Sequence, residues 1–100
     1  MHIISKNLLR EFWERHPTAE RPLKAWHKVA QHAEWKNLLS VQTVFRDAEA
    51  VKNFTVFNIK GNSFRLIVSI DYRKQLIYVK YILTHAEYDK NQWKKDERFQ

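Results

Sequence analysis

Cysteine is absent from the 100-residue sequence, and glycine and proline are scarce, with one glycine and two prolines. Without cysteine the chain can have no disulfide scaffold, no thiolate-ligated zinc site and no thiol nucleophile. A disordered chain is also excluded, because 44% of the residues are hydrophobic and can offset the entropy lost on folding. At this length we expect a single domain over residues 1–100, with a disordered tail only at about 95–100.

Long hydrophobic runs are missing as well. The apolar stretches between Met1 and Trp13 are interrupted by Lys6, Arg10 and Glu11. No run approaches the ~20 apolar residues that are needed to cross a bilayer. We therefore expect neither a signal peptide nor a membrane-spanning segment, no membrane partner, and a location in the cytoplasm.

Acidic residues are in the minority. The chain has 18 lysines and arginines against 11 aspartates and glutamates, a net charge of +7. Such a surplus favours polyanionic partners through long-range attraction and counterion release. Nucleic acid is the first candidate, although an acidic protein would satisfy the same surplus and many small proteins are basic without a specific partner.

The first half of the chain has apolar residues at helical spacing. This spacing predicts a helix at about residues 5–16, with Ser5 as its N-cap, and a second helix at about 18–33. Pro22 must lie in the first turn of the second helix, where its missing amide is tolerated. The short apolar opening at residues 2–4 could form an edge strand.

From residue 55 onward the apolar residues recur with a period of two, which is typical of strands with one face on a core. We expect an antiparallel meander of three strands, at residues 55–60, 63–71 and 76–83. Between residues 34 and 51 the pattern weakens and indicates only a short helical turn. If Arg73 and Lys74 form a two-residue turn, the facing pairs are Phe64 with Leu83, Leu66 with Tyr81, Val68 with Val79 and Ile70 with Ile77.

The same register places Arg65, Ile67 and Lys80 on the opposite face of the sheet. Lys80 would stand opposite Ile67 and diagonal to Arg65, a separation that long side chains can bridge. We therefore expect two cations on one open face, where they could bind a phosphate.

The segment after the last strand, residues 84–90, concentrates chemically active side chains. If it is helical, His85 and Tyr88 lie at i and i+3 on one face, near the end of the strand that carries Lys80. Histidine can move a proton in either direction near neutral pH, and tyrosine can donate one. The alternative is a solvated polar connection without catalytic function, since such segments often contain these residues by chance.

No metal site or cofactor is expected. The histidines are scattered, and His27 and His32 are five residues apart, the wrong spacing for a shared helical face. The sequence contains no P-loop, GxGxxG, HExxH or GxSxG pattern.

Five ordered motifs span the chain from residue 1 to about residue 94: His2-Ile3-Ile4-Ser5-Lys6; Phe12-Trp13 with His16-Pro17 and Pro22-Leu23-Lys24-Ala25-Trp26; Thr55-Val56-Phe57-Asn58-Ile59-Lys60-Gly61-Asn62; Arg65-Leu66-Ile67; and Leu83-Thr84-His85, followed after one residue by Glu87-Tyr88-Asp89-Lys90. Together they resemble the HigB toxin family. The resemblance implies an α+β fold of the RelE-like kind, with two N-terminal helices packed on a small twisted antiparallel sheet.

The resemblance also implies a function. Members of this family are bacterial toxins of type II toxin–antitoxin systems, metal-independent endoribonucleases that cleave mRNA in the ribosomal A site and so inhibit translation. Their implied partner is HigA, an antitoxin with a helix-turn-helix DNA-binding domain. A rival within the same fold is a non-catalytic protein that binds RNA or, like the ParE toxins, acts on DNA gyrase.

By the same resemblance, Arg65 corresponds to the strand arginine of the family, and His85 and Tyr88 to the histidine and tyrosine of its last motif. The implied reaction is attack of a ribose 2′-hydroxyl on the adjacent phosphate. We expect Arg65 and Lys80 to meet the phosphate charge, and His85 and Tyr88 to share the proton transfers, with base and acid unassigned. RelE-like enzymes differ among themselves in these roles, and some use lysine, so the resemblance makes Lys60 and Arg73 weaker candidates for substrate contacts.

Overall fold

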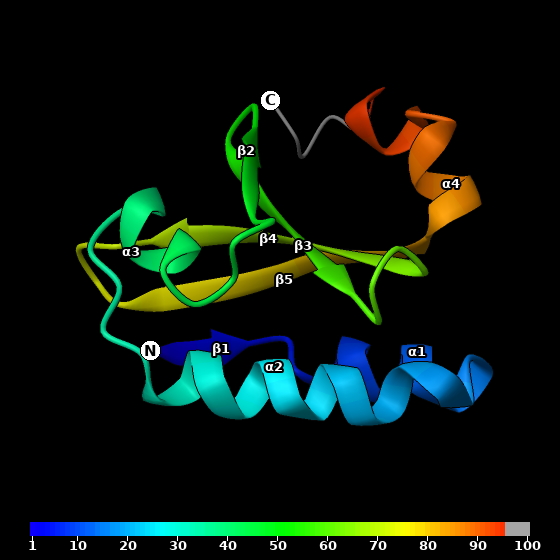
Figure 1. The fold of residues 1–100 in the computed structure, drawn as a ribbon, viewed down its shortest axis with the longest axis horizontal. Helices are drawn as coiled ribbons and strands as arrows, with labels where there is room; N and C mark the ends of the chain where they lie inside the picture. Colours follow the sequence, from blue (N-terminus) through cyan, green and yellow to red (C-terminus); the bar gives the residue numbers. More distant parts are fainter. Residues whose placement is uncertain (96–100) are drawn as a thin grey trace.

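The computed structural model of the chain describes residues 1–95 and is built in layers around one five-stranded sheet (Figure 1). In chain order the elements are β1 (His2–Ile4), α1 (Asn7–Arg15), the 3-10 turn η1 (Pro17–Ala19), α2 (Glu20–His32), α3 (Leu38–Gln42), β2 (Glu49–Val51), β3 (Phe54–Ile59), β4 (Phe64–Asp71), β5 (Leu76–Thr84), α4 (His85–Asp89) and the 3-10 turn η2 (Gln92–Lys95). The tail expected at about 95–100 lies outside the described residues, apart from residue 95 at the end of η2.

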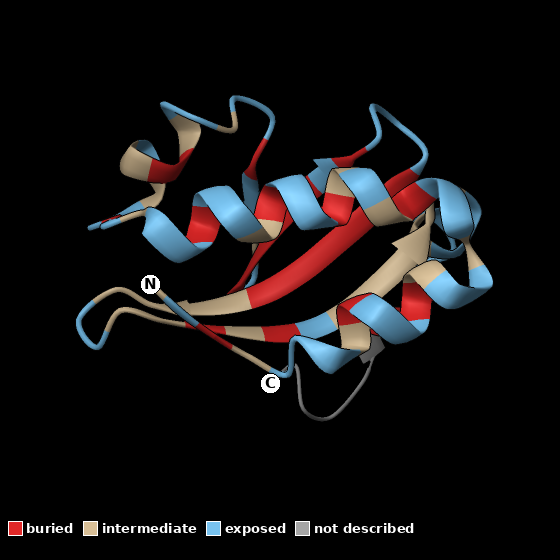
Figure 2. Cartoon of the chain, turned by 90° about the horizontal axis from the view of Figure 1, so that it is seen from below, coloured by how far each residue is buried: buried red, intermediate tan, exposed pale blue. Residues whose placement is uncertain are grey.

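The two long helices occupy the predicted places and bury most of the predicted stripes; Val29, which belongs to the predicted stripe of the second helix, is exposed instead. α1 buries Leu9 and Phe12, and α2 buries Leu23, Trp26 and Ala30. Buried and exposed residues alternate along both helices (Figure 2), and the buried ones belong to the cluster that includes residues of the sheet. Within residues 1–95, no helix has the length and apolar character that spanning a bilayer requires.

The helix starts differ in how well the sequence predicts them. Ser5 is not the N-cap of α1: Lys6 holds that position, without a side-chain cap hydrogen bond, and Ser5 adopts a positive φ of 68°. In this tight turn out of β1, Ser5 presents its carbonyl to the helix, where it accepts a hydrogen bond of 3.0 Å from the Leu8 amide. α2 begins at Glu20 and holds Pro22 in its first turn, as predicted.

The strands are ordered β1-β5-β4-β3-β2. β2 to β5 form an antiparallel meander, and β1 pairs in parallel with β5 at the edge of the sheet. The predicted meander and N-terminal edge strand are therefore confirmed, as is the α+β class, consistent with a RelE-like fold. The sequence does not predict β2, because its three residues are too few to show an alternation.

The register of β4 against β5 contains a β-bulge that the sequence does not predict. The pairing shifts by one residue between Ile67, which faces Tyr81, and Val68, which faces Val79. Lys80 falls between these pairs and faces no residue, so that its exposed side chain stays in water while the apolar residues around it remain packed. The predicted pairs are correct on the turn side of the bulge and wrong beyond it, where Phe64 faces Thr84 and Leu66 faces Ile82.

The turn between β4 and β5 is also longer than predicted. Asp71 pairs with Leu76, which leaves four residues, 72–75, in the connection. Asp71 accepts a hydrogen bond of 2.9 Å from the Lys74 amide, and Gln75 takes a positive φ of 59°. Arg73 is exposed at the tip of this wider turn.

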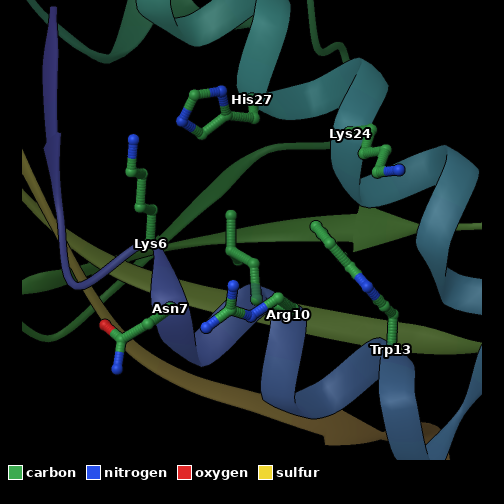
Figure 3. Close-up of a pocket in the computed structure, with 7 residues that line it drawn as sticks. Lys6, Asn7, Arg10, Trp13, Lys24 and His27 are labelled. Carbon is green, nitrogen blue, oxygen red and sulfur yellow. The ribbon is translucent and has the colours of Figure 1, made fainter.

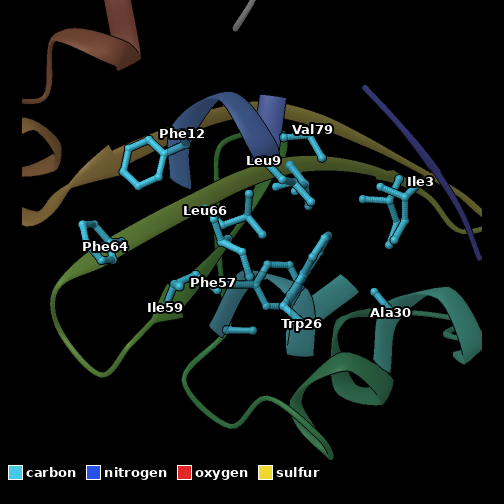
Figure 4. Packing of buried hydrophobic residues seen from close by; sticks show 14 of the residues in the cluster. Ile3, Leu9, Phe12, Trp26, Ala30, Phe57, Ile59, Phe64, Leu66 and Val79 are labelled. Carbon is cyan, nitrogen blue, oxygen red and sulfur yellow. The ribbon is translucent and has the colours of Figure 1, made fainter. Parts of the chain in front are cut away.

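Both faces of the sheet are covered, whereas the sequence predicts one open face. The larger cluster lies between the sheet and helices α1 and α2 (Figure 4), and it includes Ile3, Phe12, Trp26, Phe57, Leu66 and Val79. A smaller cluster lies on the opposite face and consists of Phe54, Val56, Ile67 and Trp93, with Val51, Tyr81, Leu83 and Tyr88 packed against it. Trp93, in the chain after α4, folds back onto this second face, which therefore holds side chains from α4 and η2.

Candidate active site

The site lies where the start of β4 meets the start of α4. Arg65 pairs with Leu83 across the β4–β5 ladder, so the residues that follow β5 lie beside the start of β4. The amide of His85 donates a hydrogen bond of 3.0 Å to the carbonyl of Ser63. This hydrogen bond ties α4, which follows the end of β5 in Figure 1, to the turn before β4, so that His85 and Tyr88 can contact Arg65.

The first turn of α4 is fixed by a capping box. The Thr84 hydroxyl accepts a hydrogen bond of 3.2 Å from the Glu87 amide, and the Glu87 carboxylate accepts one of 2.9 Å from the Thr84 amide. This hydrogen bond from the Thr84 amide is the main reason why the pKa of Glu87 is lowered. The box fixes the helical spacing that the sequence suggests for residues 84–90, and it places His85 and Tyr88 one turn apart.

Arg65 is a buried cation held by neutral groups. The residue is only 8% exposed, which corrects the expectation of an arginine on an open face: the ring of Tyr88 lies against its guanidinium group. Nη1 donates a hydrogen bond of 3.2 Å to the Phe64 carbonyl, and Nη2 donates to Oδ1 of Asn62. Within residues 1–95, no carboxylate lies at ion-pair distance from the guanidinium. Within this part of the chain, no carboxylate therefore neutralises its charge by pairing with it.

His85 lies between this guanidinium and a carboxylate. Its Nδ1 is 3.4 Å from Nη2 of Arg65, and its Nε2 is 3.0 Å from Oδ2 of Asp89. An arginine can only donate, so the contact suits an Nδ1 that carries a lone pair, with the proton on Nε2 facing Asp89. In this neutral tautomer the imidazole presents a proton acceptor on the side of the arginine.

Tyr88 completes the cluster. Its ring lies 5.4 Å from the guanidinium carbon of Arg65 and stacks on Trp93 with 5.2 Å between ring centroids. Its hydroxyl donates a hydrogen bond of 3.3 Å to Oε1 of Glu49. Burial, and after it the negative charge of Glu49, raise the pKa of Tyr88. The phenol therefore stays protonated at neutral pH and can serve as a proton donor.

The other expected site residues are placed differently. Lys60 is exposed in the β3–β4 turn, the turn that also carries Asn62, at the same end of the sheet as the cluster. Lys80 is at the bulge, past the Ile67–Tyr81 pair, and its Nζ lies 5.5 Å from the centroid of the Tyr78 ring. The far end of β4 is about 20 Å from Arg65 along the strand, at ~3.3 Å per residue. Arg73 lies beyond that end. The structure thus brings together Arg65, His85 and Tyr88, with Lys60 at the same end of the sheet, while among residues 1–95 neither Lys80 nor Arg73 forms a hydrogen bond or ion pair with these three.

Three residues of the site are not among those that the sequence analysis assigns to it. Glu49 lies on β2, a strand too short to predict, and nothing in the sequence signals its approach to Tyr88. Asn62 is visible only as a turn residue. Asp89 could have been found, because it is four residues after His85 in a segment expected to be helical. Among residues 1–95, no three histidine, aspartate or glutamate side chains are grouped so that they could hold a metal ion.

Comparisons with known protein sequences identify the family of this chain. Residues 19–91 match the profile of the HigB toxin family, described as the RelE-like toxic component of a toxin–antitoxin system. The chain is 30% identical over 93 residues to an mRNA interferase HigB of Escherichia coli O6:H1, an alignment that covers 90% of each protein. It is 28% identical over 92 residues to the mRNA interferase toxin HigB of Escherichia coli K12 and to an mRNA interferase HigB of Shigella flexneri, covering 89% of this chain and 88% of each relative. The chain therefore belongs to the HigB toxin family, the RelE-like toxins of toxin–antitoxin systems.

Proposed function

We propose that the protein is the toxin of a type II toxin–antitoxin system and an endoribonuclease that cleaves mRNA on the translating ribosome. The observation that carries this proposal is the buried Arg65, held by neutral groups against the Nδ1 of His85 and the ring of Tyr88. A cation with two proton-transfer groups beside it suits cleavage of a phosphodiester. The relatives named mRNA interferases support RNA as the substrate.

The proposed reaction needs no metal. The ribose 2′-oxygen attacks the adjacent phosphorus and the bond from phosphorus to the 5′-oxygen breaks, giving a 2′,3′-cyclic phosphate and a 5′-hydroxyl. One proton leaves the 2′-hydroxyl and one is delivered to the departing 5′-oxygen. The enzyme must supply a base, an acid and a positive charge for the phosphoryl oxygens.

The geometry of the cluster suggests how these roles are divided. His85, whose Nδ1 lone pair faces Arg65, is the base, and Asp89 stabilises the imidazolium that forms. Tyr88, protonated at neutral pH, is the acid once its hydroxyl turns from Glu49 to the leaving oxygen. Arg65 binds the phosphoryl oxygens.

Exposed lysines and arginines extend the RNA site in this proposal. Lys60 is near enough to the cluster to contact a neighbouring phosphate, while Lys80 and Arg73 meet the RNA or the ribosome further along the sheet. The partner that silences the toxin is an antitoxin of the HigA type. Because translated mRNA is the substrate, we place the protein in the bacterial cytoplasm.

The experiment is a reconstituted translation reaction with a defined mRNA, run with and without ribosomes. We expect cuts within translated codons only when ribosomes are present, each with a 2′,3′-cyclic phosphate upstream and a 5′-hydroxyl downstream. Intact mRNA in both reactions, together with inhibition of purified DNA gyrase, would replace this proposal with the non-catalytic, gyrase-directed alternative.

A further inference from the structure

A second feature of the molecule lies in the helical layer, away from the candidate active site. A groove of about 360 Å³ opens between α1 and α2 (Figure 3) and is lined by Lys6, Leu9, Arg10 and Trp13 on one side and by Lys24 and His27 on the other. Helices α1 and α2 cover one face of the sheet, whereas Tyr88 belongs to the cluster on the opposite face. The groove and the catalytic cluster are therefore separated by the sheet.

The charge of the groove has one sign. Lys6, Arg10 and Lys24 line it, and among the described residues no aspartate or glutamate does. Lys6 points toward His27 across the groove (Figure 3), and the pKa of His27 is lowered, first by burial and then by the charge of Lys6. Glu14 and Glu20 pair with Arg10 and Lys24 along the exposed helix surfaces, where such pairs contribute little. The groove therefore attracts an anionic group.

The floor of the groove is apolar. Leu9 lies at its base, and Trp13 is half-buried with its ring 5.3 Å from Nζ of Lys24. If a nucleic-acid backbone bound here, its hydrated phosphates would lie against the apolar floor and would not cover it. A protein segment can cover the floor with an apolar side chain and place its carboxylates against the surrounding lysines and arginine.

We propose that the α1–α2 groove is the docking site for an acidic segment of the antitoxin, one that inserts an apolar side chain between Leu9 and Trp13. A toxin of this family has an antitoxin as its partner, and the groove offers the matching charge and an unfilled apolar pocket. The inference rests on the proposed toxin–antitoxin pairing. A segment docked in this groove leaves the Arg65 cluster uncovered, because the groove and the cluster lie on opposite faces of the sheet.

The test compares two triple variants of the intact chain that lose the same charge. In the groove variant, Lys6, Arg10 and Lys24 are replaced by glutamine; in the control, Arg21, Lys36 and Lys74, which are exposed outside the groove, are replaced in the same way. Affinity for the purified antitoxin is measured by calorimetry at two salt concentrations. Removal of three charge pairs should raise the Kd of the groove variant roughly tenfold or more and flatten its salt dependence, whereas the control should keep the wild-type Kd within about threefold.

A second measurement does not depend on any variant folding. Amide hydrogen exchange of the wild-type chain should show new protection over α1 and the first half of α2 when the antitoxin binds. Equal affinities for the two triple variants, or protection confined to other elements, would overturn the inference. A groove variant that binds antitoxin normally but fails to cut ribosome-bound mRNA would assign the groove to RNA instead.

The two proposals can fail separately. The docking inference is supported if the groove variant, in the absence of antitoxin, cleaves mRNA at the wild-type rate but binds the antitoxin more weakly. Antitoxin binding that depends on the groove in a wild-type protein without nuclease activity would refute the proposed activity and leave the docking site standing.

Discussion

The assignment of Tyr88 as the proton donor predicts a specific behaviour of Tyr88→Phe. The substitution removes only the hydroxyl, so the ring can still stack on Trp93, 5.2 Å away, and lie against the guanidinium of Arg65. The phenylalanine cannot form the 3.3 Å hydrogen bond that the hydroxyl donates to Glu49 at the surface. A long, exposed hydrogen bond to a carboxylate contributes about 1–1.5 kcal/mol, so Tm should fall by no more than about 12 °C.

The effect on cleavage should be much larger. Loss of a general acid lowers the rate by roughly 10²–10⁴-fold. We expect this loss in the single-turnover rate of cleavage of mRNA bound to the ribosome, with the protein still folded by circular dichroism.

A sulfur substitution in the substrate separates an acid from a residue that merely supports the site. If the 5′-oxygen at the cut is replaced by sulfur, the thiolate leaves without a proton, so the defect of Tyr88→Phe should shrink to less than about 10-fold. His85→Ala should remain defective on the same substrate, because the 2′-hydroxyl still needs a base. An equal defect of Tyr88→Phe on the oxygen and sulfur substrates would show that Tyr88 is not the acid.

The surroundings of the cluster lead to three further expectations. Glu49→Gln removes a negative charge that raises the pKa of Tyr88, so the alkaline limb of the pH–rate profile, where the proton donor is lost, should move to lower pH; an unmoved limb would count against the contact. The pKa of Glu87 in the folded protein is lower than its ordinary pKa of 4.5, so its carboxylate stabilises the fold at every pH above 4.5. This contribution disappears as the pH falls through the lower pKa of the folded state. Urea denaturation should therefore show Glu87→Gln to be less stable than the wild type at pH 7, with the difference closing in acid. Trp93→Ala removes the largest side chain of the second cluster, where Trp93 is 6% exposed. The free energy of unfolding, measured by urea denaturation, should fall by about 3–5 kcal/mol. A decrease below about 1 kcal/mol would show that this cluster contributes little.

The sequence predicts those parts of the structure that depend on local periodicity. The stripe containing Leu9 and Phe12 repeats at helical spacing, and α1 follows it. The cluster of Arg65, His85 and Tyr88 is also accessible from sequence, because α4 follows β5 directly and β5 pairs with the strand that carries Arg65. Adjacent elements bring these residues together without any long-range information.

The features that the sequence does not predict depend on contacts between residues far apart in the chain. A period of two continues unbroken in the sequence through Lys80, so it cannot locate the bulge at which the register shifts. The ring of Tyr88 lies against Arg65 and is itself stacked on Trp93, which returns to the sheet from beyond α4. Glu49 reaches Tyr88 from a strand of three residues whose pairing with β3 leaves no periodic signal.

A matched pair of arginine variants tests whether the buried Arg65 is the cation of a ribonuclease site. Arg65→Ala is compared with Arg46→Ala, which removes an exposed arginine outside the site, in single-turnover cleavage of ribosome-bound mRNA, with folding checked by circular dichroism. We predict that Arg65→Ala remains folded and loses about 10²–10³-fold in rate, while Arg46→Ala cuts at the wild-type rate. A folded Arg65→Ala protein that cleaves as fast as the wild type would contradict the assignment of Arg65 to the phosphate.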